Sequence, residues 1–194
     1  ISMFIKINNN IKKKKKMKKN TKTKNVLNLI GNTPLIQINK NIYAKAEFLN
    51  PSGSIKDRIV LEMVNDAEKK GILSKNSVIV EPTTGNTGIS LAMIGGMKGY
   101  KVIIVMPEHM SVERIKLMKS YGAEVILVSK KENVKGAIKK ATDLSKKKNY
   151  VMLNQFCNRC NIKAHIKTGK EISRQVSKVD AFVAGMGTGG TIIG

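Results

Sequence analysis

Residues 78–93 read VIVEPTTGNTGISLAM, in which two apolar runs flank a loop that contains two glycines. The first run, Val78 to Glu81, is short and rich in β-branched residues, so it predicts a strand. The second run, Ile89 to Met93, follows the loop at once and predicts a helix. A strand, a glycine loop and a helix in this order are typical of an α/β fold, in which ligands bind beyond the carboxyl ends of the strands.

The same alternation of short β-branched runs and longer amphipathic runs continues along the chain. It indicates a mostly parallel sheet covered by helices on both faces, because parallel strands need a crossover helix between them. Gly71 and Ser111 stand where a helix C-terminal cap and a helix N-terminal cap belong. Further strands are predicted at 101–106, 124–128, 151–153 and 180–184, and helices at 56–70, 111–120 and 134–147.

The loop from Glu81 to Gly88 has the composition of an anion-binding site. Free backbone N–H groups at a helix start bind carboxylates and phosphates, and threonine hydroxyls add further donors. The alternative interpretation is a glycine-rich turn with threonine caps, which the local pattern alone does not exclude. Besides Glu81, the polar residues of this loop are Thr83, Thr84, Asn86 and Thr87.

A second glycine loop, Gly185 to Thr191, follows the strand predicted at 180–184. Its G-x-G-x-x-G pattern occurs in nicotinamide dinucleotide sites, but the acidic residue expected about 20 positions later lies beyond the sequence. Glycines flanked by Thr188 and Thr191 would equally hold a single phosphate through backbone amides and hydroxyls. The threonines favour the phosphate monoester.

Lys56 occupies the first turn of the helix predicted at 56–70, where Ser54 and Asp57 fit a capping-box pattern. The positive end of the helix dipole disfavours an ordinary lysine there, although surface lysines are common in this chain. A lysine whose charge is altered, either by a covalent link to a carbonyl cofactor or by a lowered pKa, would suit the position.

The formal net charge is +23, but it is distributed unevenly. Ten lysines and no acidic residue fall in residues 1–24, a Lys/Asn-rich tail that we expect to be disordered, with Met17 as a candidate start. Aromatic residues make up 4% and Trp is absent, so we do not expect a nucleic-acid partner.

No apolar run approaches the roughly 18 residues of a membrane helix, so we expect no membrane contact. The sequence predicts a cytoplasmic protein, and a mitochondrial leader is the open alternative.

Cys157 and Cys160 form the one C-x-x-C pair of the sequence. A zinc site would need two more ligands, and neither His109 nor His165 has metal-ligand spacing to this pair, so we predict no metal. Two reduced structural thiols are the expected state, and a redox pair is the alternative.

Six motifs connect these features: Ile30 to Leu35, Asn50 to Arg58, Thr83 to Gly88, Met106 to Glu108, Asn154 to Phe156, and the final glycine loop. In this order they resemble the cysteine synthase (O-acetylserine sulfhydrylase) family. The resemblance implies an α/β fold of the fold-type II pyridoxal-phosphate enzymes (tryptophan synthase β-like), with mostly parallel sheets in two three-layer domains. Residues 25–59 and 161–194 would belong to the larger, incomplete cofactor domain, and residues 60–160 to the smaller central domain.

The resemblance also implies roles for single residues. Lys56 would form the covalent link to pyridoxal 5′-phosphate and serve as general base, and Asn86 would hydrogen-bond the ring oxygen of the cofactor. The phosphate would be held by Gly187, Thr188, Gly189, Gly190 and Thr191. The substrate α-carboxylate would be bound by Thr83, Thr84, Thr87 and Gln155.

The implied activity is β-replacement of acetate in O-acetyl-L-serine by sulfide to give L-cysteine, a transferase reaction that the cofactor makes accessible. Cystathionine β-synthase, β-cyanoalanine synthase and a catalytically inactive binding or regulatory paralogue stay open as alternatives. Family members continue past the glycine loop and would be homodimers at full length, so we expect this chain to be an incomplete form. Arg159 and Cys160 stand where the family usually has Pro and Ala.

Overall fold

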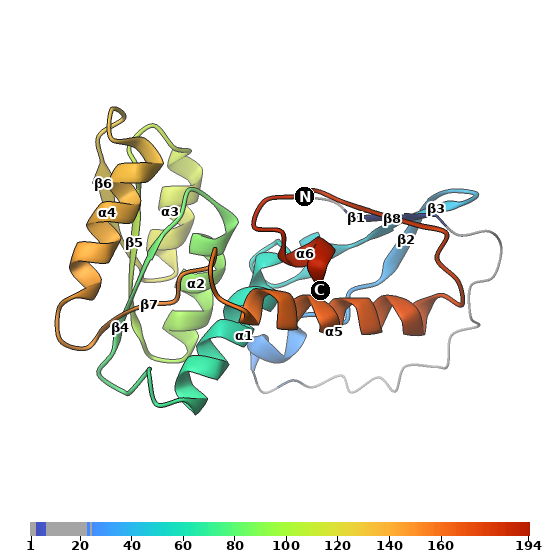
Figure 1. Cartoon of the computed structure of the whole chain (residues 1–194), viewed down its shortest axis with the longest axis horizontal. Coiled ribbons are helices and arrows are strands. Elements are labelled where there is room, and N and C mark those ends of the chain that lie inside the picture. The colour runs from blue at the N-terminus through green and yellow to red at the C-terminus, as the bar shows by residue number, and fades with distance from the viewer. Residues whose placement is uncertain (1–2, 7–22, 24) are drawn as a thin grey trace. The chain divides into compact units, whose positions relative to one another are not determined.

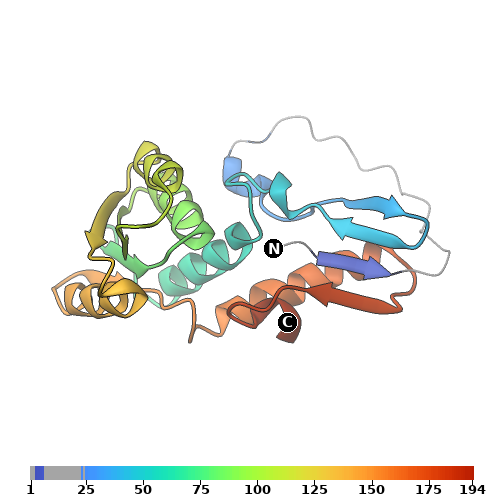
Figure 2. The same cartoon turned by 90° about the horizontal axis from the view of Figure 1, so that it is seen from above.

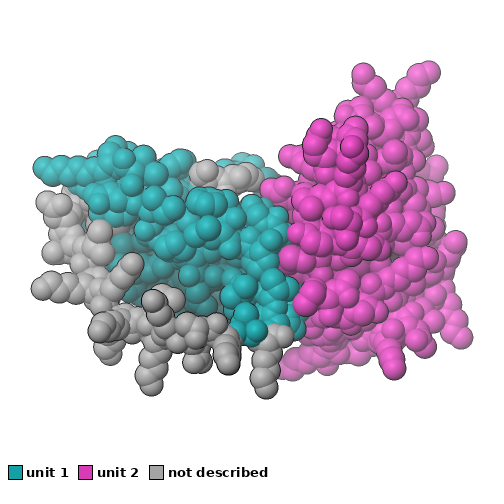
Figure 3. Space-filling view, turned by 180° about the vertical axis from the view of Figure 1, so that it is seen from behind, with its two compact units in different colours: residues 1–59, 159–194 teal, residues 60–158 magenta. Residues whose placement is uncertain are grey.

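The computed structural model describes residues 3–6, 23 and 25–194. The chain divides into two compact units, which Figure 3 shows in different colours. Unit 1 comprises residues 1–59 and 159–194, and unit 2 comprises residues 60–158. Among the described helices, none combines the length and the apolar character needed to span a bilayer.

Unit 2 is built on a four-stranded parallel sheet (Figure 1). The strand order is β6-β5-β4-β7, and all three neighbouring pairs are parallel. This confirms the parallel sheet that the sequence predicted, with boundaries shifted by one residue or so. The strands are β4 (Val78–Pro82), β5 (Lys101–Pro107), β6 (Glu124–Val128) and β7 (Tyr150–Met152).

Helices cover both faces of this sheet, with α4 on one face and α2 and α3 on the other (Figure 1). On the α4 side, Ala137 and Ala141 pack against the strand residues Val80, Ile103 and Val105, all of them buried. Small helix residues let α4 approach the sheet closely while the β-branched strand residues fill the space between them. These helices are α2 (Asn86–Met97), α3 (Val112–Ser120) and α4 (Asn133–Ser145), while α1 (Lys56–Lys69) starts in unit 1 and continues into unit 2 from Val60.

The start of α3 depends on Ser111, whose hydroxyl accepts a hydrogen bond from the Arg114 N–H at 3.4 Å. Replacing Ser111 with alanine leaves that helical N–H without its cap, so we expect the free energy of unfolding to fall by about 1 kcal/mol. Urea unfolding measures the change. Ser120→Ala is the matched control, because the Ser120 hydroxyl only returns to the Leu117 carbonyl at the other end of α3. Equal losses in the two variants would contradict the capping role.

Unit 1 contains a second four-stranded sheet, in the order β2-β3-β1-β8. Its three strand pairs are all antiparallel, which differs from the mostly parallel sheet that we predicted for both domains. The physical reason lies in the connection between β2 and β3, which has only two residues and is too short for a crossover helix. The strands are β1 (Met3–Lys6), β2 (Leu35–Asn39), β3 (Ile42–Lys45) and β8 (Ala181–Ala184).

Strand β1 falls within the segment 1–24 that we expected to be disordered, and for Met3–Lys6 that expectation was wrong. It pairs with β3 on one side and β8 on the other, and the side chains of Met3 and Ile5 are fully buried. Alternate burial of apolar residues, rather than composition, determines this strand. The remaining tail residues, 1–2, 7–22 and 24, lie outside the described residues, and Met17 is among them.

A long helix, α5 (Cys160–Gln175), runs along the sheet of unit 1 (Figure 2). Ile172 and Val176 at its end pack against Ile5 and Tyr43 of the sheet. The sequence did not predict this helix.

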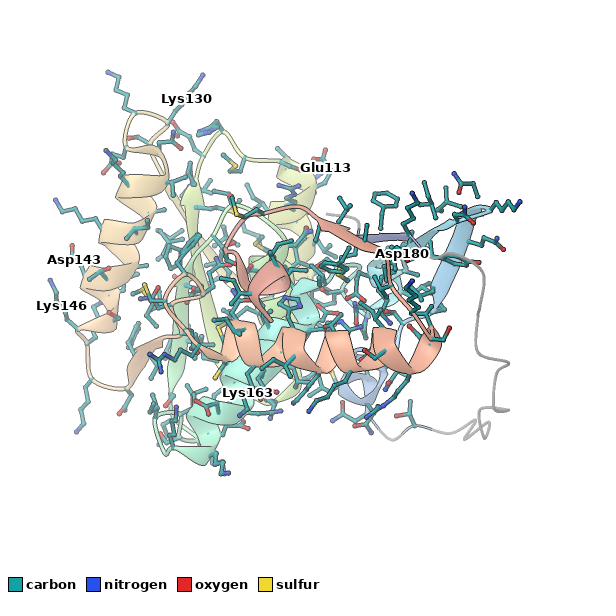
Figure 4. All side chains as sticks on the ribbon, turned by 45° about the vertical axis from the view of Figure 1, so that its right-hand side comes forward. Glu113, Lys130, Asp143, Lys146, Lys163 and Asp180 are labelled. Carbon is teal, nitrogen blue, oxygen red and sulfur yellow. The ribbon has the colours of Figure 1, made fainter. Side chains whose placement is uncertain are left out.

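Charged side chains, among them those labelled Lys130, Lys146 and Lys163, point outward from the ribbon (Figure 4). The short helical turns are η1 (Val26–Leu29), η2 (Glu47–Leu49) and α6 (Gly190–Ile193).

Candidate active site

The loop from Thr83 to Gly88, which we call the threonine loop, belongs to unit 2. It lies at the carboxyl end of β4, where an α/β sheet places its ligands. The Thr83 N–H donates to the Val105 carbonyl at 3.1 Å, which extends the pairing of β4 with β5 beyond Pro82. Helix α2 begins at Asn86, and Thr87 in its first turn is buried. Arg114 donates to the Thr84 carbonyl at 3.2 Å, which brings a guanidinium to the loop. The loop thus has a fixed backbone, a helix N-terminus and a nearby positive charge.

Gln155 follows β7, the strand beside β4, and so reaches the same edge of the sheet. The Thr87 hydroxyl donates to Gln155 Oε1 at 2.6 Å, and both side chains are buried. With Oε1 engaged as the acceptor, Nε2 is the donor end of this amide. The structure therefore brings together Thr87 and Gln155, two residues that the sequence predicted for one anion site.

Lys56 lies in unit 1 as the first residue of α1. Its backbone N–H donates to the Ser54 hydroxyl at 3.2 Å, while the Asp57 carboxylate accepts from the Ser52 N–H at 2.8 Å and from the Ser52 hydroxyl. Burial lowers the pKa of the Lys56 amine, because the neutral form is favoured away from water. A larger neutral fraction makes this amine a better nucleophile and base than a surface lysine.

Two residues after Lys56, Arg58 fixes the first turn of α1 through two carboxylates. Its guanidinium bonds Glu47 at 2.7 and 2.8 Å and Glu171 at 2.7 and 2.8 Å. Burial by itself would raise the pKa of Glu171, but hydrogen bonds from Arg58 and from the Asn32 N–H outweigh it and lower that pKa to about 2. The pKa of Glu47 is also lowered, because the hydrogen bonds and charge of Arg58 outweigh burial. Helix α1 is thereby tied to η2 and to α5.

The glycine loop follows β8 and ends in the short turn α6. Asn161 of α5 donates to the Thr188 hydroxyl at 2.8 Å. A Cβ atom on Gly190 would lie only 2.1 Å from Asn161 Oδ1, so the backbone approaches α5 more closely than any other residue type allows. Gly189 has a φ of +80°, a left-handed conformation that also favours glycine. The two glycines shape the loop, and Asn161 fixes one of its hydroxyls.

His165 connects the glycine loop with the surroundings of Lys56. Its Nε2 lies 3.3 Å from the Thr191 hydroxyl, and its Nδ1 lies 3.4 Å from the Thr168 hydroxyl. Burial, reinforced by the positive charges of Lys56 and Arg58, lowers the pKa of His165 to about 4. A neutral imidazole at pH 7 can donate with one nitrogen and accept with the other. The neutral ring can therefore hydrogen-bond both hydroxyls at once.

The lowered pKa makes stability depend on pH. Because His165 titrates at 6.5 in a model peptide and at about 4 in the fold, the unfolded chain binds more protons between these values. The free energy of unfolding is therefore complete above pH 6.5 and falls as the pH decreases towards 4, by about 2 kcal/mol between pH 7 and pH 5. Urea unfolding at both values, compared with His165→Gln, tests this. A pH dependence that is the same in the variant would assign the effect to other groups.

Comparison with known proteins decides the family. The sequence model described as "Pyridoxal-phosphate dependent enzyme" matches residues 26–194, which include Lys56 and both loops. The chain belongs to this family of pyridoxal-phosphate dependent enzymes. The resemblance and the α/β fold that the sequence predicted are thereby confirmed.

Relatives within the pyridoxal-phosphate dependent enzymes are similar throughout this range. A cysteine synthase of Flavobacterium sp. is 48% identical over 182 residues, and the alignment covers 89% of this chain and 59% of the relative. Cysteine synthase A of Escherichia coli is 47% identical over 173 residues, with 85% and 54% covered. The chain thus spans less than two thirds of the length of these relatives.

Two solved structures of the same family resemble the fold. The hydrogen sulfide-producing enzyme of Fusobacterium nucleatum superposes with a TM-score of 0.83 at 49% identity, covering 87% of this chain and 60% of that one. The cysteine synthase of Entamoeba histolytica superposes with a TM-score of 0.81 at 35% identity, covering 96% and 58%.

Lys56 and the glycine loop fit a phosphate-bearing aldehyde cofactor of the kind this family uses. The Gly190 backbone and two threonine hydroxyls have the donors that suit a phosphate, and the lowered pKa of Lys56 suits a covalent link to an aldehyde. Cys157 is exposed and Cys160 is buried, and no disulfide joins them. Within the described residues, His, Cys, Asp and Glu form no group of three that could hold a metal ion.

Sequence reasoning missed the residues that hold these loops in place. Asn161 and His165 lie four positions apart and therefore on one face of α5, but their spacing carries a signal only once the helix is known. Glu81 closed the predicted strand and was not assigned a role, although it is almost fully buried. A charged residue inside an apolar strand pattern was the signal that could have identified it.

Proposed function

We propose that this chain carries the cofactor and substrate sites of a cysteine synthase, which replaces the acetate of O-acetyl-L-serine by sulfide. One observation carries the proposal: a half-buried lysine with a lowered pKa at the start of α1 lies in one unit with a glycine loop suited to phosphate. The cysteine synthases that match this chain at 45–48% identity support the choice of reaction.

Unit 1 would hold the cofactor. Lys56 would form the covalent link to pyridoxal 5′-phosphate, and Gly187, Thr188, Gly189, Gly190 and Thr191 would bind its phosphate through backbone N–H groups and hydroxyls. Asn86, at the first position of α2, would bond the ring oxygen. When bound, the cofactor supplies an electron sink for the negative charge that develops at the substrate Cα.

The substrate carboxylate would be bound in unit 2. Thr83, Thr84, Thr87 and Gln155 present hydroxyl, amide and backbone donors at one sheet edge, and a helix N-terminus adds a favourable dipole. The Lys56 amine would take the proton from the substrate Cα and return it after the exchange at Cβ. Acetate leaves with its bonding electron pair and sulfide brings one, so the exchange needs no oxidant or reductant.

Further features of the whole protein belong to the same proposal. Units 1 and 2 would correspond to the larger cofactor domain (25–59 and 161–194) and the smaller central domain (60–160). The partners would be a small amino acid and sulfide, with a homodimer at full length and a cytoplasmic location.

A second candidate is release of sulfide from cysteine, favoured by the 49% identity to an enzyme described as hydrogen sulfide-producing. The test incubates the full chain and its Lys56→Ala variant with pyridoxal phosphate in four reactions, each followed by mass spectrometry. O-acetyl-L-serine is supplied with sulfide, cyanide or homocysteine, and L-cysteine is supplied alone. The proposal predicts that cysteine forms fastest and depends on Lys56. Faster formation of cyanoalanine, cystathionine or free sulfide would select the corresponding alternative.

A chain that binds the cofactor at Lys56 but yields no product in any of the four reactions would favour the catalytically inactive paralogue. That outcome contradicts the proposed activity while leaving the cofactor site intact. If a longer version of the chain restores turnover, the loss is due to the absence of the residues that this version adds.

A further inference from the structure

Glu81 is a buried carboxyl group with no role in the proposed reaction. It lies near the end of β4, only 1% exposed, two positions before Thr83, where the loop starts. Burial raises the pKa of Glu81, against the lowering effect of hydrogen bonds from the backbone of residues 153–155. A carboxyl group in such a place costs folding free energy unless its oxygens are bonded. Its partners therefore indicate what it does.

Those partners are consecutive backbone N–H groups of the turn after β7. Glu81 Oε2 accepts from the Asn154 N–H and Oε1 from the Gln155 N–H, both at 2.9 Å. Asn154 has a φ of +54°, so the turn curls into a left-handed conformation that points successive N–H groups at one spot. Such an arrangement binds anions in many proteins, and here a side chain of the same unit provides the anion.

The turn that Glu81 holds carries Gln155, whose side chain is fixed at its other end by Thr87. The 2.6 Å bond from the Thr87 hydroxyl sets Oε1 as the acceptor, and the two bonds to Glu81 set the position of the backbone. Gln155 is thus held between the strand before the threonine loop and the helix after it. We propose that Glu81 is a positioning residue for carboxylate binding, which acts by fixing Gln155 against the threonine loop. The proposal rests on the proposed function only in that Gln155 binds an anionic group of the substrate.

Glu81→Gln keeps the size of the side chain but replaces one acceptor oxygen with an NH₂ group, which faces a backbone N–H and cannot bond it. We expect the amides of residues 154 and 155 to exchange with solvent roughly tenfold faster, and acetate to bind the threonine loop about tenfold more weakly. Both are measured by NMR on the labelled full chain, with acetate as the probe. Glu68→Gln is the control, since Glu68 bonds Lys98 and Tyr100 at the other end of α2.

A double-mutant cycle separates positioning from general destabilisation. If Glu81 acts through Gln155, then Glu81→Gln weakens acetate binding in the unmodified chain but adds nothing in a Gln155→Ala background. An additive loss, or acetate affinity within twofold of the unmodified chain in Glu81→Gln, overturns the proposal. If the unmodified chain binds no acetate, the carboxylate site of the proposed function fails and the role of Glu81 fails with it. Acetate binding by the unmodified chain therefore distinguishes a failure of the Glu81 proposal from a failure of the proposed carboxylate site.

Discussion

Replacing Arg58 with alanine is expected to lower the free energy of unfolding of unit 1 by about 3–5 kcal/mol, the cost of leaving a buried carboxylate without its partner. Glu47 loses its ion-pair partner and Glu171 loses one of two, because Arg58 bonds both carboxylates, and it is itself only 6% exposed. Lys45 stays bonded to Glu171 at 3.0 Å but does not reach Glu47 in this network. The measurement is chemical denaturation followed by circular dichroism.

Arg58→Lys provides a second variant if the alanine variant does not fold. Lysine keeps the charge but cannot form paired bonds with both acids, so an intermediate loss is expected. The control is Lys146→Ala, which removes an exposed ion pair with Asp143 on α4, and for which we expect no measurable change. Arg58→Ala with unchanged stability would contradict the role of this network in holding the first turn of α1, and with it the position of Lys56.

Replacing Gly190 with alanine is expected to weaken cofactor binding by roughly ten- to a hundredfold, because a hydrogen bond to a charged phosphate contributes about 1.5–3 kcal/mol. The added methyl group would lie 2.1 Å from Asn161 Oδ1 and 2.6 Å from Asn161 Cγ, so either the loop or Asn161 must move. A moved Asn161 no longer orients the Thr188 hydroxyl. Titration with pyridoxal phosphate, followed by its absorbance, measures the affinity.

Two variants show whether the loss is steric. Gly169→Ala adds a methyl group on α5 whose nearest atom lies at an ordinary 3.9 Å, so its affinity should match that of the unmodified chain. Combining Gly190→Ala with Asn161→Ala removes the atoms that collide and should restore part of the binding. If the double variant binds more weakly than Gly190→Ala alone, the collision with Asn161 is not the cause.

The fold was predictable where apolar residues follow one another. Strands β4 and β5 are buried over nearly their whole length, and their β-branched runs stand out against the polar loops. Strand β2 is the opposite case, since four of its five residues are exposed and no alternation marks it. Strand β1 owes its order to pairing with β3 and β8, which are distant in the sequence, and local composition carries no trace of that pairing.

The residues of the candidate site also fall into a group that the sequence predicts and a group that it does not. The threonine loop, the turn around Lys56 and the glycine loop are local motifs, so their residues could be predicted from the sequence. The residues that hold them depend on contacts between distant parts of the chain, such as that of Glu81 with Asn154, 73 positions apart, and that of Arg58 with Glu171, 113 positions apart. Such contacts exist only after the sheet and helices have packed, and a single sequence does not encode them in any local pattern.

Among the many lysines of this basic chain, Lys56 is the one that we propose forms the link to the cofactor. The most direct measurement adds pyridoxal phosphate to the purified chain, reduces with borohydride, digests the product and locates the modified lysine by mass spectrometry. Exposed lysines such as Lys146, whose side chain is 72% exposed, serve as internal controls for unspecific labelling. We expect one dominant site at Lys56, with a visible absorbance band that is lost in Lys56→Ala. Labelling spread over surface lysines, with the same spectrum in the variant, would contradict it.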